Sequence, residues 1–193
     1  MRPSRLFVAL SVALVLALGC KKGSKKGGRL ASEKLRPHVA ALAKVDPASI
    51  SISMDEEIAR NLWFARAQIP NGPEYRCFVD PQEVLCDRGE GRIFRELVAH
   101  RRLGDNRASI DDPAWVAMVR HAYGLKFIFP EPGFPIASGI DPKRDLRVPL
   151  VERPDDGGVI MSVWGVDARG QTVRIDVKVV GEGDANVTIK PLP

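Results

Sequence analysis

The sequence predicts an α+β fold in which N-terminal helices and a disulfide hairpin pack with a C-terminal antiparallel β-meander. Apolar residues at helical spacing dominate the chain up to residue 124, whereas four strand-like runs occupy residues 146–190. Two cysteines, Cys77 and Cys86, flank a turn between two short β-prone runs. Because helices and strands are segregated along the chain, we expect the helices to cover one face of an antiparallel sheet.

The first predicted helix spans residues 32–44. Leu35, Val39 and Leu42 recur there at helical spacing and predict its buried stripe. Pro37 is expected to limit the ordered part, because proline is easily tolerated only in the first turn of a helix.

A short strand over residues 49–53 and a second helix from Met54 to about Gln68 are predicted next. Serine and isoleucine alternate over 49–53, as in a half-buried strand. Ser53 and Glu56 have the spacing of a capping box, which predicts that the helix starts directly after Ser53. The predicted apolar stripe of this helix consists of Ile58, Leu62, Ala65 and Ile69.

The segment from Cys77 to Cys86 predicts a β-hairpin around the turn sequence at 80–83. If Val79 pairs with Val84, the two cysteines face each other across an antiparallel pair. Directly opposed Cα atoms lie about 4.5–5.5 Å apart, which is within reach of a disulfide. The alternative, a metal or redox site, has neither a CxxC motif nor a nearby histidine in its favour.

Two further helices and a β-meander complete the predicted body. The helices span 91–103 and 112–123, and the second has Pro113 at its start and Gly124 at its end. A short strand is predicted over 125–129. The strand-like runs of the meander are 146–152, 159–166, 171–180 and 186–190, and in the third Val173, Ile175, Val177 and Val179 face one way.

The positive charge of the sequence is concentrated at its N-terminus. The formal net charge is +5, but the first 29 residues hold seven basic and no acidic residues, which leaves −2 for residues 30–193. A basic footprint on the folded body is therefore not supported, and no nucleic-acid partner is expected.

Residues 1–19 have the pattern of a secretory signal peptide. Arg2 and Arg5 precede an apolar run over 6–18 that is too short for an ordinary spanning helix. The sequence Leu16-Ala17-Leu18-Gly19-Cys20 resembles the lipobox of bacterial lipoprotein signal peptides, with alanine where the usual pattern has its first leucine.

This resemblance implies a lipoprotein precursor that is cut at Gly19–Cys20 and lipidated on Cys20. It implies membrane contact through the lipid and a cell-envelope location, with the body in the periplasm or at the cell surface. Lys21 stands where an aspartate often retains such proteins at the inner membrane, which favours the outer membrane. The alternatives are an ordinary secretory signal with an incidental cysteine and an uncleaved anchor helix.

Residues 20–29 are rich in lysine and glycine and predict a flexible tether. Its lysines are interpreted as a solvated spacer. The alternative is attraction to anionic headgroups, worth about 1 kcal/mol per lysine near a charged surface. A single α+β domain over residues 30–193 is expected to follow.

No motif in the sequence predicts catalysis, a metal or a cofactor. His38, His100 and His121 have no metal-ligand spacing, and neither a GxSxG elbow nor a dinucleotide fingerprint occurs. The acidic residues at 55–57 and 111–112 fall at predicted helix N-termini, where carboxylates stabilise a helix. We therefore expect no cofactor and no metal, and we interpret each histidine as structural.

The segment from Phe127 to Pro135 is the predicted partner surface. It combines Phe127, Phe129 and Phe134 with three prolines and one glycine. Long ordered loops of this kind are often binding loops. The alternative is a buried strand followed by a loop that is pinned to the core by Phe134.

Two functions are consistent with these features. The first is a membrane-anchored envelope lipoprotein that acts without catalysis, as a binding or structural component for an envelope protein or a cell-wall partner. The alternative is a periplasmic enzyme, such as a hydrolase, whose site is assembled from residues far apart in the sequence.

Overall fold

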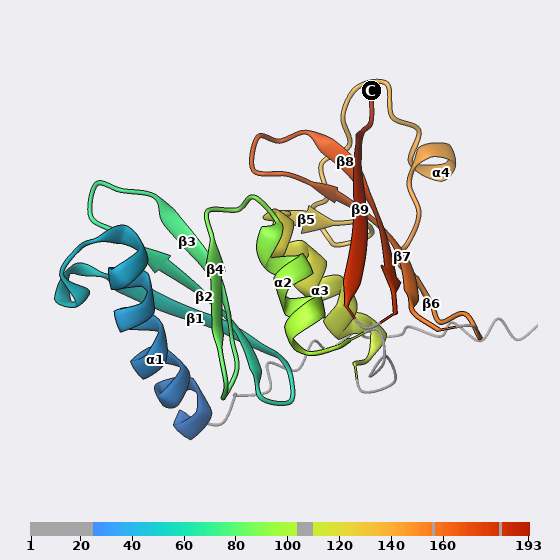
Figure 1. The fold of residues 1–193 in the computed structure, drawn as a ribbon. Helices are drawn as coiled ribbons and strands as arrows, with labels where there is room; N and C mark the ends of the chain where they lie inside the picture. The colour runs from blue at the N-terminus through green and yellow to red at the C-terminus, as the bar shows by residue number, and fades with distance from the viewer. Residues whose placement is uncertain (1–24, 104–109, 156, 182) are drawn as a thin grey trace, which may run out of the picture.

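A computed structural model describes residues 25–103, 110–155, 157–181 and 183–193. The described chain forms four layers, in the order helix α1, sheet A, the helix pair α2–α3, and sheet B (Figure 1). The fold is α+β, as the sequence predicts, with helices and antiparallel sheets. The sequence predicted one sheet covered by helices, and the structure corrects this to two sheets that enclose a helix layer.

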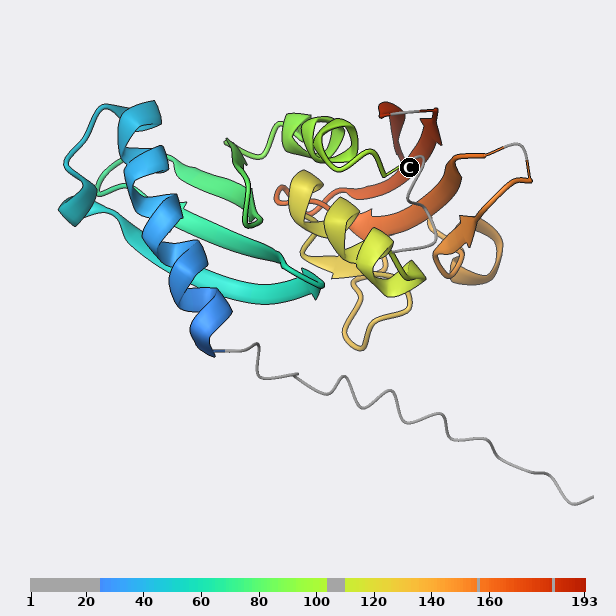
Figure 2. The same ribbon diagram turned by 60° about the horizontal axis from the view of Figure 1, so that its bottom comes forward.

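Sheet A consists of four antiparallel strands in sequential order. Its strands are β1 (Ser51–Ala59), β2 (Leu62–Gln68), β3 (Glu74–Val79) and β4 (Val84–Asp87). Helix α1 (Lys25–Ala43) crosses one face of the sheet (Figure 2). Leu35 and Val39 of α1 are fully buried against this face, whereas the predicted core residue Leu42 is 49% exposed.

Helix α1 is longer than predicted. It begins at Lys25, so residues 25–29 are helical where the sequence predicted a tether, and residues 20–24 lie outside the described residues. Pro37 lies inside the helix without ending it. Because the exposed ring of Pro37 is on the solvent side, the buried stripe of α1 passes it uninterrupted.

The predicted helix from Met54 to Gln68 is wrong, because this segment forms strands β1 and β2. A turn at Asn61, where φ is 58°, joins the two strands, and Met54 pairs with Ala65. Over its first four residues β2 is covered on both faces, by α1 on the side of Ala65 and by the helix pair on the side of Leu62 and Phe64. A strand that is buried on both faces carries a near-continuous apolar run, and such a run fits a helical period as well as a strand period. The capping box at Ser53 and Glu56 is therefore accidental.

The cysteine hairpin forms as predicted. Cys77 pairs with Cys86 in the β3–β4 register, with their Cα atoms 4.2 Å apart, and the sulfurs form a disulfide. Both cysteines are buried on the face of sheet A beneath α1. The disulfide therefore reinforces the layer that supports α1.

Asp80 closes the turn of this hairpin and links it to the following helix. Its Oδ1 accepts backbone hydrogen bonds from Gln82 and Glu83, each 2.8 Å long. Its Oδ2 lies 3.0 Å from Nε2 of His100 and 3.3 Å from Nε of Arg101. His100 Nδ1 lies 2.7 Å from a carboxylate oxygen of Glu83. The Asp80 side chain is 2% exposed, so its charge depends on these partners.

The helix pair lies between the two sheets. Helix α2 spans Arg92–His100, and helix α3 spans Asp112–Tyr123 with the predicted ends. Asp111 caps α3 by accepting a hydrogen bond of 2.9 Å from Ala114 N, and Gly124 ends it with φ at 65°. The predicted role of the acidic pair 111–112 is thus confirmed.

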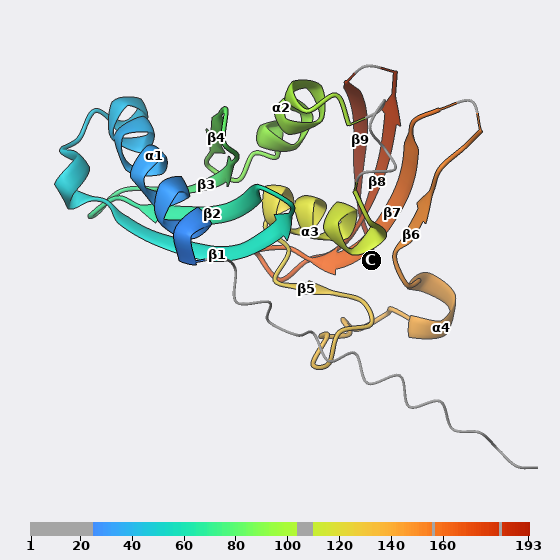
Figure 3. The same cartoon turned by 90° about the horizontal axis from the view of Figure 1, so that it is seen from below.

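Sheet B has the path β5-β7-β8-β9, with β6 also paired to β7 (Figure 3). Its inner face packs on α2 and α3, with the alternating valines and isoleucine of β8 pointing inward as predicted. Residues 142–145 form a short helix that the sequence did not predict, and the predicted strand 146–152 is limited to β6. The elements of this half are β5 (Phe127–Ile128), α4 (Pro142–Asp145), β6 (Leu150–Glu152), β7 (Val159–Val166), β8 (Thr172–Val180) and β9 (Asp184–Pro191).

One hydrophobic cluster joins both sheets through the helix pair. Trp115 and Phe94 of the helices are fully buried between Phe78 of sheet A and Met161 and Ile175 of sheet B. The two sheets therefore share one core, which holds them in a fixed position relative to each other.

Stability should depend on the ionised state of Asp80 at acidic pH. Burial alone would raise the pKa of this carboxyl, but the backbone hydrogen bonds from Glu83 and Gln82 and the charges of His100 and Arg101 lower the pKa below its ordinary value. The stabilisation is therefore complete above about pH 4, the ordinary aspartate pKa, and is lost as the pH falls through the lower folded-state pKa.

Asp80→Asn is expected to lower the free energy of unfolding near neutral pH by about 1–3 kcal/mol, because it leaves buried partners without their charged acceptor. As the pH falls below about 4, the wild type should lose more stability than Asp80→Asn, as measured by urea unfolding at each pH. Asp155→Asn, at an exposed loop position, is the control. Equal acid sensitivity of the wild type and Asp80→Asn would contradict the assigned role.

Candidate functional site

The site residues predicted from the sequence do not come together. Cys20 lies outside the described residues. Cys77 and Cys86 are joined to each other beneath α1. Phe127 lies on β5 in sheet B, whereas α1 lies on sheet A. A binding site must therefore be sought among residues that the sequence did not single out.

The aromatic segment packs against its own surroundings. Phe129 and Phe134 form an edge-to-face pair with ring centroids 5.5 Å apart. Both are partly buried against a small cluster of Ile140, Leu146 and Trp164. Phe127 is also partly buried. This packing favours Phe134 as a residue that pins the loop, and it disfavours an exposed aromatic anchor for a partner.

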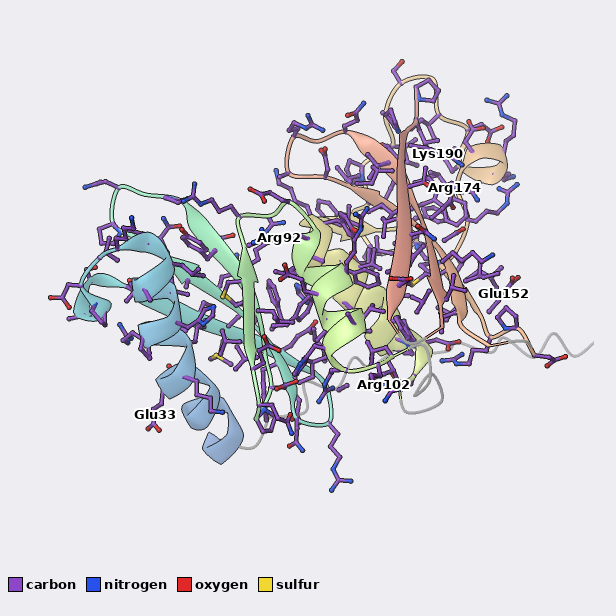
Figure 4. All side chains as sticks on the ribbon, viewed as in Figure 1. Glu33, Arg92, Arg102, Glu152, Arg174 and Lys190 are labelled. Atoms are coloured by element: carbon purple, nitrogen blue, oxygen red, sulfur yellow. A yellow bond between two sulfur atoms is a disulfide. The ribbon has the colours of Figure 1, made fainter. Side chains whose placement is uncertain are left out.

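The outer face of sheet B carries a charged cluster that is satisfied internally. Arg174 lies over the Trp164 ring at 4.9 Å and pairs with Asp176 at 2.7 Å (Figure 4). Lys190 and Ser162 contact the same carboxylate at 3.0 Å and 2.8 Å. Because Asp176 already has three partners, this cluster stabilises the sheet and offers little to a ligand.

Two hollows meet at Arg76, and we call the pair of them the Arg76 groove. The first hollow, of about 440 Å³, lies between the β4–α2 loop, the β7–β8 turn and the inner face of sheet B. The second, of about 340 Å³, lies between sheet A and the C-terminal end of α3. Arg76, Leu125 and Ala168 line both hollows. Figure 1 shows the β7–β8 hairpin reaching toward the β4–α2 loop above the helix pair.

Arg76 is held in place by the backbone around it. A Cβ atom at Gly124 would lie 1.7 Å from Nη1 of Arg76, and one at Gly89 would lie 3.2 Å from it. Only glycine leaves this space at the end of α3, where the carbonyl ends of the helix also favour a cation. The Arg76 side chain is 20% exposed, and its contact with Glu74 is 3.8 Å long. Within the described parts of the chain, its guanidinium has no hydrogen-bond acceptor.

The first hollow combines an apolar floor with a basic wall. Val173 and Ile175 of β8 and Ile189 of β9 belong to the floor, and Arg88 and Arg169 extend the basic wall. Tyr123 closes the hollow on the helix side, and burial raises its pKa to about 12, so its phenol stays protonated and can donate a hydrogen bond.

The second hollow contains a histidine–carboxylate pair at its edge. The imidazole of His121 stacks on Phe64 with ring centroids 3.9 Å apart. Its Nε2 lies 2.5 Å from Oε1 of Glu56, and this hydrogen bond lowers the pKa of the Glu56 carboxyl. Arg66 pairs with Asp55 at 2.7 Å in the same hollow. The acidic residues 55–57 thus lie on β1, which corrects the prediction that they start a helix.

The groove is more basic than the body as a whole. Residues 30–193 carry a net charge of −2, yet the groove lining has six basic and four acidic residues. The basic residues are Arg66, Arg76, Arg88, Arg120, Lys126 and Arg169, and the acidic residues are Asp55, Glu74, Glu90 and Asp167. Two of the acids, Asp55 and Asp167, already pair with arginines of the lining. Glu74 lies within 4.0 Å of both Arg66 and Arg76, and Arg120 pairs with Glu131 at 2.6 Å. The lining therefore keeps a small basic excess, and Arg76 stands where the two hollows meet.

The sequence contained little that could have revealed this groove. In a strand, Arg76 must point away from the face that holds Tyr75 and Cys77. Nothing near it in the sequence shows that Gly89, Gly124 and the β7–β8 turn converge on its guanidinium. Each of these comes from a different element, and only the stacking of the two sheets brings them together.

Comparison of this chain with protein-family models, curated proteins and solved structures finds no match. Within the described residues, none of the helices combines the length and the apolar composition needed to cross a membrane. The features of this chain that bear on function are therefore the lipobox resemblance and the geometry of the groove.

Phe134→Ala is expected to lower the free energy of unfolding by about 2–3 kcal/mol, because it empties part of the cluster beneath the loop. Chemical denaturation would measure the loss. Ile136→Ala is the matched control, since Ile136 is 54% exposed in the same loop and its truncation should change stability by less than about 0.5 kcal/mol. An unchanged stability for Phe134→Ala would restore Phe134 as a candidate anchor.

Proposed function

We propose that this protein is an exported lipoprotein of a bacterial envelope, anchored through lipid on Cys20, whose folded domain is a non-enzymatic binding component. The lipobox resemblance at residues 16–20 supports the anchor. Lys21 after the cysteine supports the outer membrane. The body would lie in the periplasm or at the cell surface.

The observation that carries the binding role is the positioned guanidinium of Arg76, which faces two hollows without a hydrogen-bond acceptor among the described residues. A cation that is fixed by packing loses little conformational entropy when it binds an anion. The groove therefore suits recognition of an anionic group on a partner in the envelope.

A lipid anchor at Cys20 would leave the groove open. Cys20 precedes the first residue of α1 by five positions, and five residues span at most about 18 Å. In Figure 1 the start of α1 lies at the lower end of the molecule, and the loops that line the groove lie at the upper end. A lipid on Cys20 would thus hold the groove on the side away from the membrane.

A periplasmic enzyme remains the second candidate, supported by the His121–Glu56 pair at the edge of the groove. A carboxylate that orients a histidine is a common arrangement for a general base. The described lining of the groove has no serine, threonine or cysteine, so such an enzyme would have to activate water. The binding role requires only an anionic ligand, whereas the enzyme would require both a substrate and a positioned water molecule.

Mature protein from the native host is expected to begin at Cys20, to carry acyl chains and to fractionate with membranes. Cys20→Ala should block lipidation and leave unprocessed precursor, because the thiol is the acceptor of the lipid. Intact mass spectrometry of both proteins measures this. An unmodified Cys20, or cleavage at another bond, would overturn the anchor.

A photo-crosslinking residue at Ala168 should form a discrete adduct in intact cells, because Ala168 lines both hollows. The adduct should decrease at least about fivefold in Arg76→Gln and stay unchanged in Arg144→Gln, at an exposed arginine on α4, as judged by immunoblot. Loss of an ester-hydrolase activity in His121→Gln and Glu56→Gln, with the adduct absent from the wild type, would favour the enzyme instead.

A further inference from the structure

We infer that the Arg76 groove takes a carboxylate joined to an apolar group, with the carboxylate on Arg76 and the apolar group in the first hollow. This inference rests on the proposed binding function and adds the chemistry of the ligand. It follows from the meeting of an uncovered apolar surface and a positioned guanidinium in one small hollow.

The apolar surface is the part of the β8–β9 inner face that lines the hollow at Ile189 and Pro191. Ile189 pairs with Ile175, and Pro191 pairs with Val173. Ile175 and Val173 are themselves buried in the core, so Ile189 and Pro191 supply the exposed apolar area. Ile189 is 50% exposed although it faces inward and lines the hollow. Covering this side chain with an apolar group would remove it from water, which favours binding.

The anionic end of the ligand is specified by the arginine. A guanidinium presents two parallel N–H donors that match both oxygens of a carboxylate. The 3.8 Å contact with Glu74 leaves these donors without a hydrogen bond in the described part of the chain. Arg88, which also lines the hollow, adds a second positive charge. An amphiphile with a cationic or neutral head group would leave the positive charges of Arg76 and Arg88 without an anionic partner from the ligand.

The size of the hollow limits the ligand. A volume of about 440 Å³ lies at the lower end of the range of about 300–1,000 Å³ that holds small molecules, and it is too small for a helix or a folded partner. Two sources supply the required chemistry at this size: a free organic acid with an apolar body, and the C-terminal residue of a peptide with an apolar side chain.

The test uses the full lipidated chain in nanodiscs of zwitterionic lipid, with empty nanodiscs as the blank. Calorimetric titration would compare 4-phenylbutyrate with 4-phenylbutanol, which lacks the charge, and with acetate, which lacks the apolar body. The acid is expected to bind at least about tenfold more tightly than either. N-acetyl-Gly-Phe and its amide distinguish the two sources. If N-acetyl-Gly-Phe binds and phenylbutyrate does not, the ligand is a peptide C-terminus. If both acids bind, a carboxylate joined to an apolar group is sufficient.

Two variants locate the ligand. Arg76→Gln should weaken binding of the acid at least about tenfold, while Arg144→Gln, at an exposed arginine on α4, should change it less than about twofold. Ile189→Ser should weaken it at least about threefold, while Ile136→Ser, at an equally exposed isoleucine outside the groove, should not. Because Ile189 is half exposed, its variant should fold even if Arg76→Gln does not.

The inference is overturned if the alcohol or the amide binds as tightly as the acid, or if folded Arg76→Gln and Ile189→Ser both bind like the wild type. Failure of all five probes, together with an Ala168 crosslink that still depends on Arg76, would reject this ligand chemistry and retain the binding role. Loss of that crosslink as well would reject both.

Discussion

The burial of α2 and α3 on both sides is the constraint on which the rest of the structure depends. Neither sheet buries its apolar face against the other. Each buries it against the same two helices, with Trp115 and Phe94 fully enclosed between them. Because the helices present apolar residues to both sheets, the sheets cannot shift independently without opening the shared core.

The groove is a direct consequence of this arrangement. Helix α3 ends at Tyr123 and α2 begins at Arg92, and the hollows lie beside these helix ends. Beyond α3 the apolar layer between the sheets is reduced to residues such as Leu125, which lines both hollows. Loops and charged side chains occupy that space incompletely, and Arg76 stands at its centre.

Most of the charged clusters described above satisfy themselves. Asp80 has His100 and Arg101, Asp176 has Arg174 and Lys190, and both clusters tie secondary-structure elements together. Arg76 differs from these because it is fixed by glycine backbone and not by a carboxylate at hydrogen-bonding distance. This difference separates a residue available to a ligand from residues that hold the fold.

The sequence by itself determined the local features whose causes are local. The hairpin register of Cys77 with Cys86 follows from a short turn between two β-prone runs, and the ends of α3 follow from Asp111 and Gly124. The alternation of apolar and polar residues in β8 follows from one solvent-exposed face and one buried face. Only the tertiary structure decided that residues 54–68 are strands, because the start of β2 is covered on both faces and there loses the alternation that would mark it. The tertiary structure alone also brought Arg76 to Gly89 and Gly124. These contacts depend on how two sheets stack on one helix layer, and no short-range sequence pattern encodes this stacking.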